Sequence, residues 1–271
     1  MKIFYRISDE SYVKDKLPGA DKRRCLENFL SIFKPADVTI LADNCHTPLL
    51  DWLDAQNLNA HETNMGNAGS FLHALDMACN TDMDGEVIYF VEDDYLHLPD
   101  APKILNEGLR GDYVTLYDHP DKYGPLYNLG NDIESKVFRT PSSHWRTTIS
   151  TCMTFAARVS TLKRDRGIFR ENCVNNHPND HEIFVELEKR GRMLVSSIPG
   201  AACHIDLTYS LSLGQFAIEP WAVEIVVKDA RERLMTPATA SIIEHAEKTL
   251  SGVELLSFLV ALEGVGKNPK N

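Results

Sequence analysis

Short apolar runs alternate with amphipathic segments through the first 117 residues, and this alternation is the feature that most constrains the fold. Most of the runs are rich in β-branched and aromatic residues, and none is longer than seven residues. Runs of this length between polar flanks are typical of strands buried on both faces. Strands that alternate with helices predict an α/β fold with a mostly parallel sheet. The expected strands are Lys2–Ser8, Val38–Leu41, Leu58–Glu62, Val87–Val91 and Tyr113–Tyr117.

The second half of the chain departs from this pattern. Strands are expected at Ser135–Thr140 and Thr147–Ala157 without a long helix between them, which predicts antiparallel pairing. Pro178–Arg190 is a predicted helix, Met193–Ile198 is a predicted strand, and from about Pro220 the pattern is helical. The expected architecture is therefore a Rossmann-like, mostly parallel sheet flanked by helices, with a small antiparallel sheet and C-terminal helices.

Charge and cysteine usage limit the class of partner and the compartment. The chain carries a formal net charge of -11, which argues against a nucleic-acid binder because such a protein needs a basic face. Six cysteines without a CxxC pair are typical of reduced thiols in a cytosolic protein. The sequence has no signal-peptide pattern and no run near the roughly 20 apolar residues of a membrane span. We therefore expect a soluble, cytoplasmic protein without a transmembrane segment.

Residues 253–262 form a broad apolar stripe at helical spacing. The stripe has no basic flank, which makes a membrane-surface helix the weaker explanation. It predicts a packing face against the rest of the chain or against a second subunit, which would make the protein a homodimer through its C-terminal helices.

Three consecutive carboxylates, Glu92, Asp93 and Asp94, follow the fourth expected strand. In an open α/β sheet, ligands bind outside the carboxyl ends of the strands. Burying an unpaired carboxylate is costly, and a divalent cation is a suitable partner for clustered carboxylate oxygens. The triplet therefore suggests a metal-assisted site, while a solvated acidic turn is the alternative when the triplet is taken alone.

The order of polar groups along the chain resembles the GT-A-fold glycosyltransferases, especially their family 2-like branch. In that family a nucleotide-binding half precedes an acceptor-binding half. The resemblance implies a glycosyltransferase domain over residues 1–215, with halves 1–118 and 119–215, and a helical extension over 216–271. The groups that carry it are Asp43 after a strand, the Gly/Asn-rich turn 64–69 before a helix, the acidic triplet, Asn179–Asp180 before a later helix, and His204.

In this resemblance the triplet takes the place of the family's DxD motif and implies Mn²⁺ or Mg²⁺. Asp94 would ligate the metal, and Glu92 or Asp93 would contact the ribose or hold a metal-bound water. Glu92 departs from the family's aspartate, so its task stays open. His204 would be a further metal ligand, although a histidine beside apolar residues is also a common packed partner. The metal would neutralise the leaving diphosphate of a nucleotide-sugar.

Four residues are candidates for the rest of the nucleotide site. The resemblance implies that Asp43 bonds the nucleobase, although this residue also suits a helix cap or a turn. Arg6 would pair with the diphosphate, or it simply ends a strand. Asn67 and Gly69 match a helix entry that lets the backbone approach the nucleotide, while Gly69 also suits an ordinary turn.

The acceptor side has four candidates. Asp180 matches the family's catalytic base, and Glu182 is the second candidate for that role. Asp180 also suits the cap or first turn of a helix, where the dipole favours negative charge. Trp145 and Arg146 lie in a stretch rich in aromatic, basic and hydroxyl groups, which suits sugar binding or an ordinary amphipathic strand.

These assignments imply a metal-dependent, inverting glycosyltransferase. It would move a sugar from a nucleotide-sugar, expected to be a nucleoside-diphosphate sugar, to a hydroxyl of a glycan or other acceptor, as in polysaccharide biosynthesis. One alternative is a binding module that kept the fold and lost the chemistry, because Glu92 and Asn179 depart from the family pattern. The other is a nucleotidyltransferase, which would need a glycine-rich loop with arginine or lysine after the first strand to hold a triphosphate. Ser8–Ser11 stands at that place and contains acids and no glycine, which argues against this function.

Overall fold

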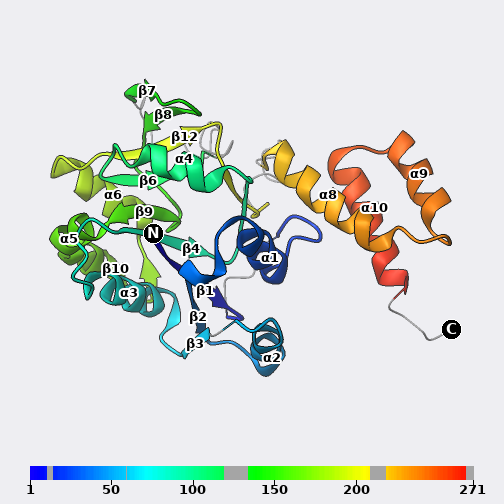
Figure 1. Cartoon of the computed structure of the whole chain (residues 1–271), viewed down its shortest axis with the longest axis horizontal. Helices are drawn as coiled ribbons and strands as arrows, with labels where there is room; N and C mark the ends of the chain where they lie inside the picture. The colour runs from blue at the N-terminus through cyan, green and yellow to red at the C-terminus, as the bar shows by residue number, and fades with distance from the viewer. Residues whose placement is uncertain (11–14, 59, 119–133, 208–217, 267–271) are drawn as a thin grey trace.

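Strands and helices alternate through the first half of the protein, as expected (Figure 1). The computed structural model describes residues 1–10, 15–58, 60–118, 134–207 and 218–266. The elements of this half are β1 (Lys2–Ser8), α1 (Lys22–Ile32), the 3-10 helix η1 (Pro35–Asp37), β2 (Val38–Asp43), α2 (Thr47–Ala55), β3 (Ala60–Thr63), α3 (Gly66–Cys79), β4 (Val87–Glu92), β5 (Tyr95–His97), α4 (Ala101–Gly108) and β6 (Tyr113–Thr115).

The second half adds further strands to the same sheet and ends in helices. Its elements are β7 (Val137–Arg139), β8 (His144–Thr147), β9 (Phe155–Arg158), α5 (Val159–Asn172), β10 (Cys173–Val174), β11 (His177–Pro178), α6 (Asp180–Lys189), β12 (Leu194–Ile198), β13 (Ala202–His204), α8 (Pro220–Leu234), α9 (Ala240–Thr249) and α10 (Gly252–Gly266).

The main sheet has the strand order β3-β2-β1-β4-β9-β6-β12-β8-β7. Strands β3, β2, β1 and β4 pair in parallel. The pairings beyond β4 place β9 and β8 against the direction of the other strands. A separate antiparallel pair joins β5 and β13. The expected fold class, a mostly parallel sheet flanked by helices with a small antiparallel sheet and C-terminal helices, is confirmed.

The stretch Thr147–Ala157 is not the single strand that the sequence predicted. Strand β8 ends at Thr147 and β9 begins at Phe155, with a loop between them. Cys152 and Met153 in this loop have φ angles of 46° and 58°, which no strand residue adopts. Helix α5, directly after β9, was also not predicted.

Each face of the sheet carries its own apolar layer. On β1, Tyr5 and Ile7 pack in the cluster that includes Leu26 of α1 and Leu49 of α2. On the same strand, Phe4 points to the other face, where α3, α5 and α6 supply Phe71, Leu162 and Phe184 among others. Because strand side chains alternate between faces, a strand covered on both sides is apolar at most positions, which explains the short apolar runs.

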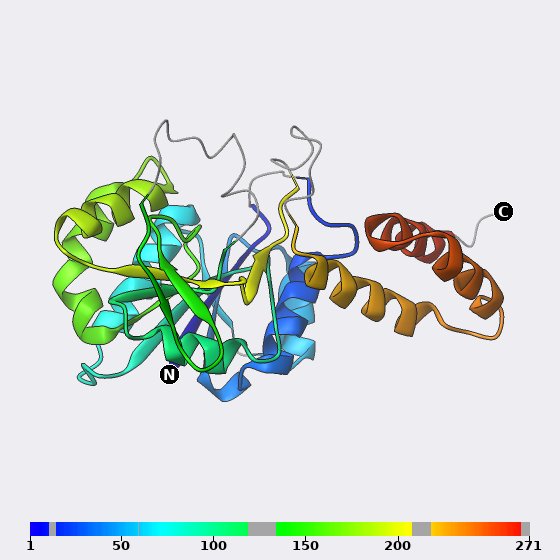
Figure 2. The same ribbon diagram turned by 90° about the horizontal axis from the view of Figure 1, so that it is seen from above.

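Helices α8, α9 and α10 lie to one side of the sheet, beyond α1 (Figure 2). Val226 of α8 and Leu256 of α10 pack with Cys25 of α1. Within the bundle, Leu255 and Leu259 join a second cluster with α9. The apolar stripe is therefore covered largely by the chain itself, and a homodimer through these helices stays a prediction. None of the helices in the described ranges has both the length and the apolar character needed to cross a bilayer.

Candidate active site

A cleft of about 540 Å³ lies at the edge of the sheet where β1, β2 and β4 end. Parallel pairing places the carboxyl ends of these strands at one edge, with Arg6 opposite Glu92 and Ser8 opposite Asp43. Nine of the twelve candidate residues line the cleft, whereas Gly69, Trp145 and Arg146 do not. The nine are Arg6, Asp43, Asn67, Glu92, Asp93, Asp94, Asp180, Glu182 and His204.

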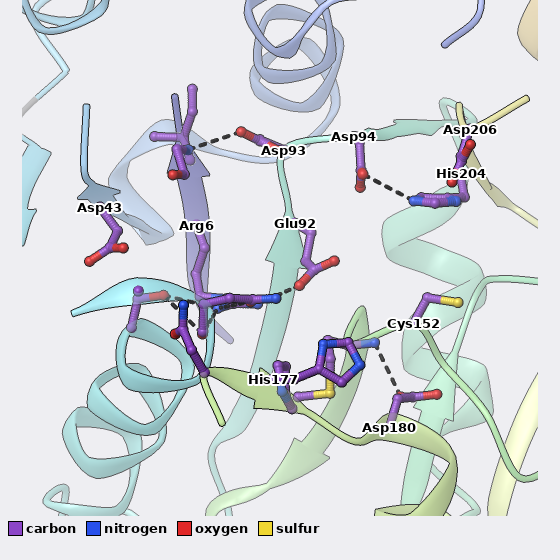
Figure 3. A pocket seen from close by; sticks show the side chains of 18 of the residues that line it. Arg6, Asp43, Glu92, Asp93, Asp94, Cys152, His177, Asp180, His204 and Asp206 are labelled. Atoms are coloured by element: carbon purple, nitrogen blue, oxygen red, sulfur yellow. Dashed lines mark hydrogen bonds and ion pairs between the residues drawn. The ribbon is translucent and has the colours of Figure 1, made fainter. Parts of the chain in front are cut away.

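Arg6 ties three elements together at the floor of the cleft (Figure 3). Its guanidinium donates to the Asn67 carbonyl at 2.7 Å, to Asn67 Oδ1 at 3.2 Å and to Ser70 Oγ at 3.0 Å, all from α3. It also forms an ion pair with Glu92 at the end of β4. Only 7% of Arg6 is exposed, so the guanidinium is committed to protein acceptors and fixes the entry to α3.

Glu92 and Asp93 lie in an environment that disfavours their charged forms. Burial is the main cause that raises the pKa of Glu92 to about 7, and its ion pair with Arg6 only partly offsets that effect. Burial and the neighbouring Asp94 raise the pKa of Asp93 to about 6, against a hydrogen bond of 3.0 Å from the Ser8 N–H to Asp93 Oδ2. This end of the cleft therefore brings together carboxylates whose charged forms are disfavoured, which favours cation binding.

Asp94 and His204 are in contact in the cleft, with His204 Nε2 3.0 Å from Asp94 Oδ2 (Figure 3). The pairing of β5 with β13 brings them together, since Tyr95 is directly opposite His204. Asp206, two residues after His204, also lines the cleft. The ammonium of Lys16 lies 4.0 Å from the same Asp94 oxygen.

The Asp94–His204 pair fits a divalent metal by the chemistry of its donors. A carboxylate oxygen and an imidazole nitrogen suit Mn²⁺, with further carboxylates nearby in Asp93 and Asp206. The described ranges contain no ready-made cluster of three or more His, Cys, Asp or Glu ligands.

Asp43 organises the turn between β3 and α3. Its Oδ1 accepts hydrogen bonds from Thr63 Oγ1 at 2.8 Å and from the Met65 N–H at 2.7 Å. Its Oδ2 accepts from Asn44 Nδ2 at 2.9 Å. The residue lines the cleft but is nearly buried, so its observed contacts match the turn role that the sequence also allowed.

Asp180, at the start of α6, holds the loop between β8 and β9. Its Oδ1 accepts from Thr151 Oγ1 at 2.5 Å and from the Met153 N–H at 3.2 Å. Its Oδ2 accepts from Ser150 Oγ at 2.7 Å and from the Thr151 N–H at 2.8 Å. A carboxylate has about four lone-pair sites, and here four protein donors use them. The loop they hold includes the left-handed residues Cys152 and Met153.

Glu182 lies two residues after Asp180, in the same first turn of α6, but has different surroundings. Its side chain is exposed and lines the cleft. Among the contacts of the described residues, Glu182 has no hydrogen bond or ion pair. Its carboxylate is therefore open to a ligand from the cleft.

The β10–β11 hairpin closes the cleft beside the start of α3. Asn175 and Asn176 form its tip with φ angles of 53° and 58°, which asparagine tolerates better than most residues. Asn176 Oδ1 accepts from the Ala68 N–H at 3.3 Å. A Cβ at Gly66 would lie 2.3 Å from that oxygen, so glycine is required there by the close approach and by its φ of 73°.

Trp145 and Arg146 are not placed to bind an acceptor in this cleft. The Trp145 ring is fully buried, stacks on Phe138 and donates its Nε1–H to Thr140 Oγ1 at 2.9 Å. The expectation that this ring stacks on a sugar is wrong for this structure, because neither face is open. Arg146 Nη2 lies 2.7 Å from Asp118 Oδ1. Gly69 lies within α3, where an added Cβ would meet the Cβ of Met65 at 2.8 Å.

Several cleft residues were missed from the sequence. Asp206 could have been found, because residues two apart on an extended segment share a face and His204 was already a candidate. The Asn175–Asn176 pair is a recognised turn signal that would have predicted the hairpin. Lys16 carries no such signal, because only the tertiary structure brings it to Asp94.

The chain matches no protein-family model and no curated protein sequence. Several solved structures have a similar backbone at low similarity. A nucleotidyl transferase from Methanothermobacter thermautotroptrophicus is 12% identical, over 72% of this chain and 87% of that one, with a TM-score of 0.40. A CMP:2-keto-3-deoxy-manno-octonic acid synthetase complexed with CTP is 12% identical, over 85% and 98%, with a TM-score of 0.45. Residues 1–349 of TarS from S. aureus are 12% identical, over 88% and 68%, with a TM-score of 0.41. At these values the function of the chain has to be inferred from its own cleft.

Proposed function

We propose that the protein is a metal-dependent glycosyltransferase that uses a nucleotide-sugar donor and inverts the anomeric centre. The observation that carries the proposal is the composition of the cleft at the ends of β1, β2 and β4. One side offers the Asp94–His204 pair within an excess of carboxylates, and the other side offers the open carboxylate of Glu182. A cation-binding side and a proton-accepting side are what sugar transfer from a nucleoside diphosphate requires.

On the donor side, Asp94 and His204 would hold Mn²⁺ or Mg²⁺. The bound metal would act as a Lewis acid that stabilises the leaving diphosphate. Arg6 would hold Glu92 and the start of α3 in place, since its own donors are used by Asn67, Ser70 and Glu92. The first turn of α3, opened by Gly66, would then border the nucleotide.

On the acceptor side, we assign the role of general base to Glu182. Asp180 was the first candidate by resemblance, but four protein donors use its lone pairs and leave no site for an acceptor hydroxyl. Asp180 would act as a positioning residue for the wall made by Ser150–Met153. Glu182 would take the proton as the hydroxyl attacks the anomeric carbon and the bond to the diphosphate breaks.

The first test is calorimetric titration of the full chain with UDP, GDP, CDP and dTDP, each with and without Mn²⁺. Binding of at least one nucleotide that depends on Mn²⁺ is expected. The best binder names the donor class, and its sugar conjugates are then assayed for transfer and hydrolysis. Failure of all four to bind with the metal would overturn the proposal, and binding without turnover of any donor would favour a binding module of the same fold.

The second test separates the two candidate bases. Glu182→Gln is expected to lower kcat by roughly 10²-fold or more and to leave nucleotide affinity unchanged, because general-base catalysis contributes on that scale. Unchanged kcat in Glu182→Gln would return the base role to another group.

A nucleotidyltransferase is the second candidate function. The observation that favours it is Lys16, a cation from the segment after β1 that lines the cleft beside Asp94. Incubation with each nucleoside triphosphate and a sugar phosphate distinguishes the two reactions, because only a nucleotidyltransferase releases pyrophosphate.

A further inference from the structure

The backbone on both sides of Lys16 is hydrogen-bonded to the segment that follows His204. The Leu17 N–H donates to the Ile205 carbonyl at 2.9 Å, and the Leu207 N–H donates to the Asp15 carbonyl at 2.6 Å. Lys16 and Asp206 form an antiparallel bridge between these bonds. Leu17 is 1% exposed in the cluster that contains Ile205 and Leu207. The backbone of Lys16 is therefore held in place beside the cleft, while its long side chain can change direction.

Lys16 is the cation of the cleft whose ion pair can be exchanged for another. Within the described part of the chain, Arg6 and Lys16 are the two lining residues with a permanent positive charge. Arg6 is held by four acceptors at the floor. Lys16 has one ion pair, at 4.0 Å, with Asp94 Oδ2. A lysine ammonium on a flexible stem can exchange one anionic partner for another at little cost in geometry.

Asp94 Oδ2 is also the oxygen that lies 3.0 Å from His204 Nε2. A divalent cation held by Asp94 and His204 would thus meet the Lys16 ammonium on the same oxygen. Like charges at this distance repel by an amount that changes affinity measurably in a partly buried cleft. The phosphates of a nucleoside diphosphate would bring the negative charge that the displaced ammonium needs.

We propose that Lys16 competes with the divalent metal for Asp94 and transfers its ion pair to the diphosphate when metal and nucleotide bind together. The inference rests on the proposed function and deepens it, because it gives the diphosphate its protein cation and makes metal binding weak until the nucleotide is present. Metal and nucleotide binding would then be coupled through one side chain.

The test uses Lys16→Met, which keeps the apolar stem and removes the charge. Mn²⁺ alone, and then UDP, GDP, CDP and dTDP in the presence of Mn²⁺, are titrated into the full-length protein by calorimetry. Mn²⁺ alone is expected to bind on the order of tenfold more tightly, and the best nucleoside diphosphate on the order of tenfold more weakly. Lys16→Arg, which keeps the charge, is expected to stay near the wild type in both titrations. Lys163→Met is the matched control, because Lys163 Nζ pairs with Asp84 at 2.7 Å outside the cleft.

Opposite signs in the two titrations are the signature, since a merely structural role would weaken both. Unchanged or weaker Mn²⁺ binding in Lys16→Met would overturn the competition, and unchanged nucleotide affinity would overturn the transfer. Lys16→Gln provides a second neutral variant if Lys16→Met melts early. If no nucleotide showed Mn²⁺-dependent binding to the wild type, the metal would instead be removed from the proposed function, so the two failures are distinguishable.

Discussion

The two sides of the cleft use carboxylates in opposite ways. At the end of β4, Glu92, Asp93 and Asp94 are crowded together, and the pKa values of Glu92 and Asp93 are raised by burial. At the start of α6, the single carboxylate of Asp180 accepts four hydrogen bonds from the loop opposite. On one side carboxylates crowd one another, and on the other a single carboxylate is surrounded by hydrogen-bond donors.

This difference assigns ligand binding to one side of the cleft and a structural role to the other. Carboxylates that crowd one another gain from a cation, whereas a carboxylate with all its lone pairs in use mainly holds its neighbours. The acidic side should therefore respond to metal and pH, and the Asp180 side should respond in stability.

The largest expected effect is on the Asp180 side. Asp180→Asn replaces an acceptor oxygen with an NH₂ group that faces two protein donors, so the unfolding free energy should fall by about 3 kcal/mol. Urea unfolding measures the change. Glu182→Gln, two residues away on the same helix, is the control and should unfold like the wild type. Equal stability of the two variants would contradict the structural role of Asp180.

Asp94→Asn should have the next largest effect, and it should be on binding. Loss of the charged ligand is expected to weaken Mn²⁺-dependent nucleotide binding about 100-fold, which is about 2.7 kcal/mol. Calorimetry of nucleotide with Mn²⁺ measures it, and the melting temperature should not fall. Asp100→Asn, an exposed aspartate before α4, is the control. If Asp94→Asn bound metal and nucleotide normally, the acidic side would not be the metal site.

The pH dependence of stability should expose the crowding on the acidic side. Asp93 has a folded-state pKa of about 6, above the ordinary value of 3.8 for an aspartate, so the folded state holds this proton more tightly than the unfolded chain. The contribution of the protonated Asp93 to the unfolding free energy is present at low pH and is lost as the pH rises through about 4 to 6. Glu92, with a pKa of about 7, extends the window upward. Urea unfolding in EDTA at about pH 4 and about pH 7.5 should show that Asp93→Asn reduces this loss by an amount on the order of 2 kcal/mol. A variant with the full wild-type pH dependence would contradict the raised pKa.

Ser150→Ala should have the smallest effect. It removes one of the four donors to Asp180 and leaves the other three, so a loss of about 1 kcal/mol is expected. The same urea experiment measures it. A loss as large as that of Asp180→Asn would mean that the stabilisation by Asp180 is not divided among its four hydrogen bonds.

Much of the fold was predictable because it depends on local patterns. The runs Lys2–Ser8 and Val87–Val91 became β1 and β4, since a strand covered on both faces is mostly apolar along its length. The stretch Thr147–Ala157 failed because its apolar and hydroxyl residues suit a strand equally well, while its loop is set by distant contacts with Asp180. Trp145 failed for a similar reason, since an aromatic residue on a strand gives no sign of whether its ring faces a ligand or the core.

The sequence by itself determined that acids would gather at the carboxyl end of a parallel sheet, because the alternation of apolar runs and helices predicts parallel strands, whose carboxyl ends meet at one edge. Which acids have partners was decided only by the tertiary structure. Asp94 meets His204 and Lys16 from segments 110 and 78 residues away along the chain, and Asp180 meets a loop about 30 residues before it. Hydrogen bonds and ion pairs act over a few ångströms in space, so these roles depend on the packing that brings distant segments together.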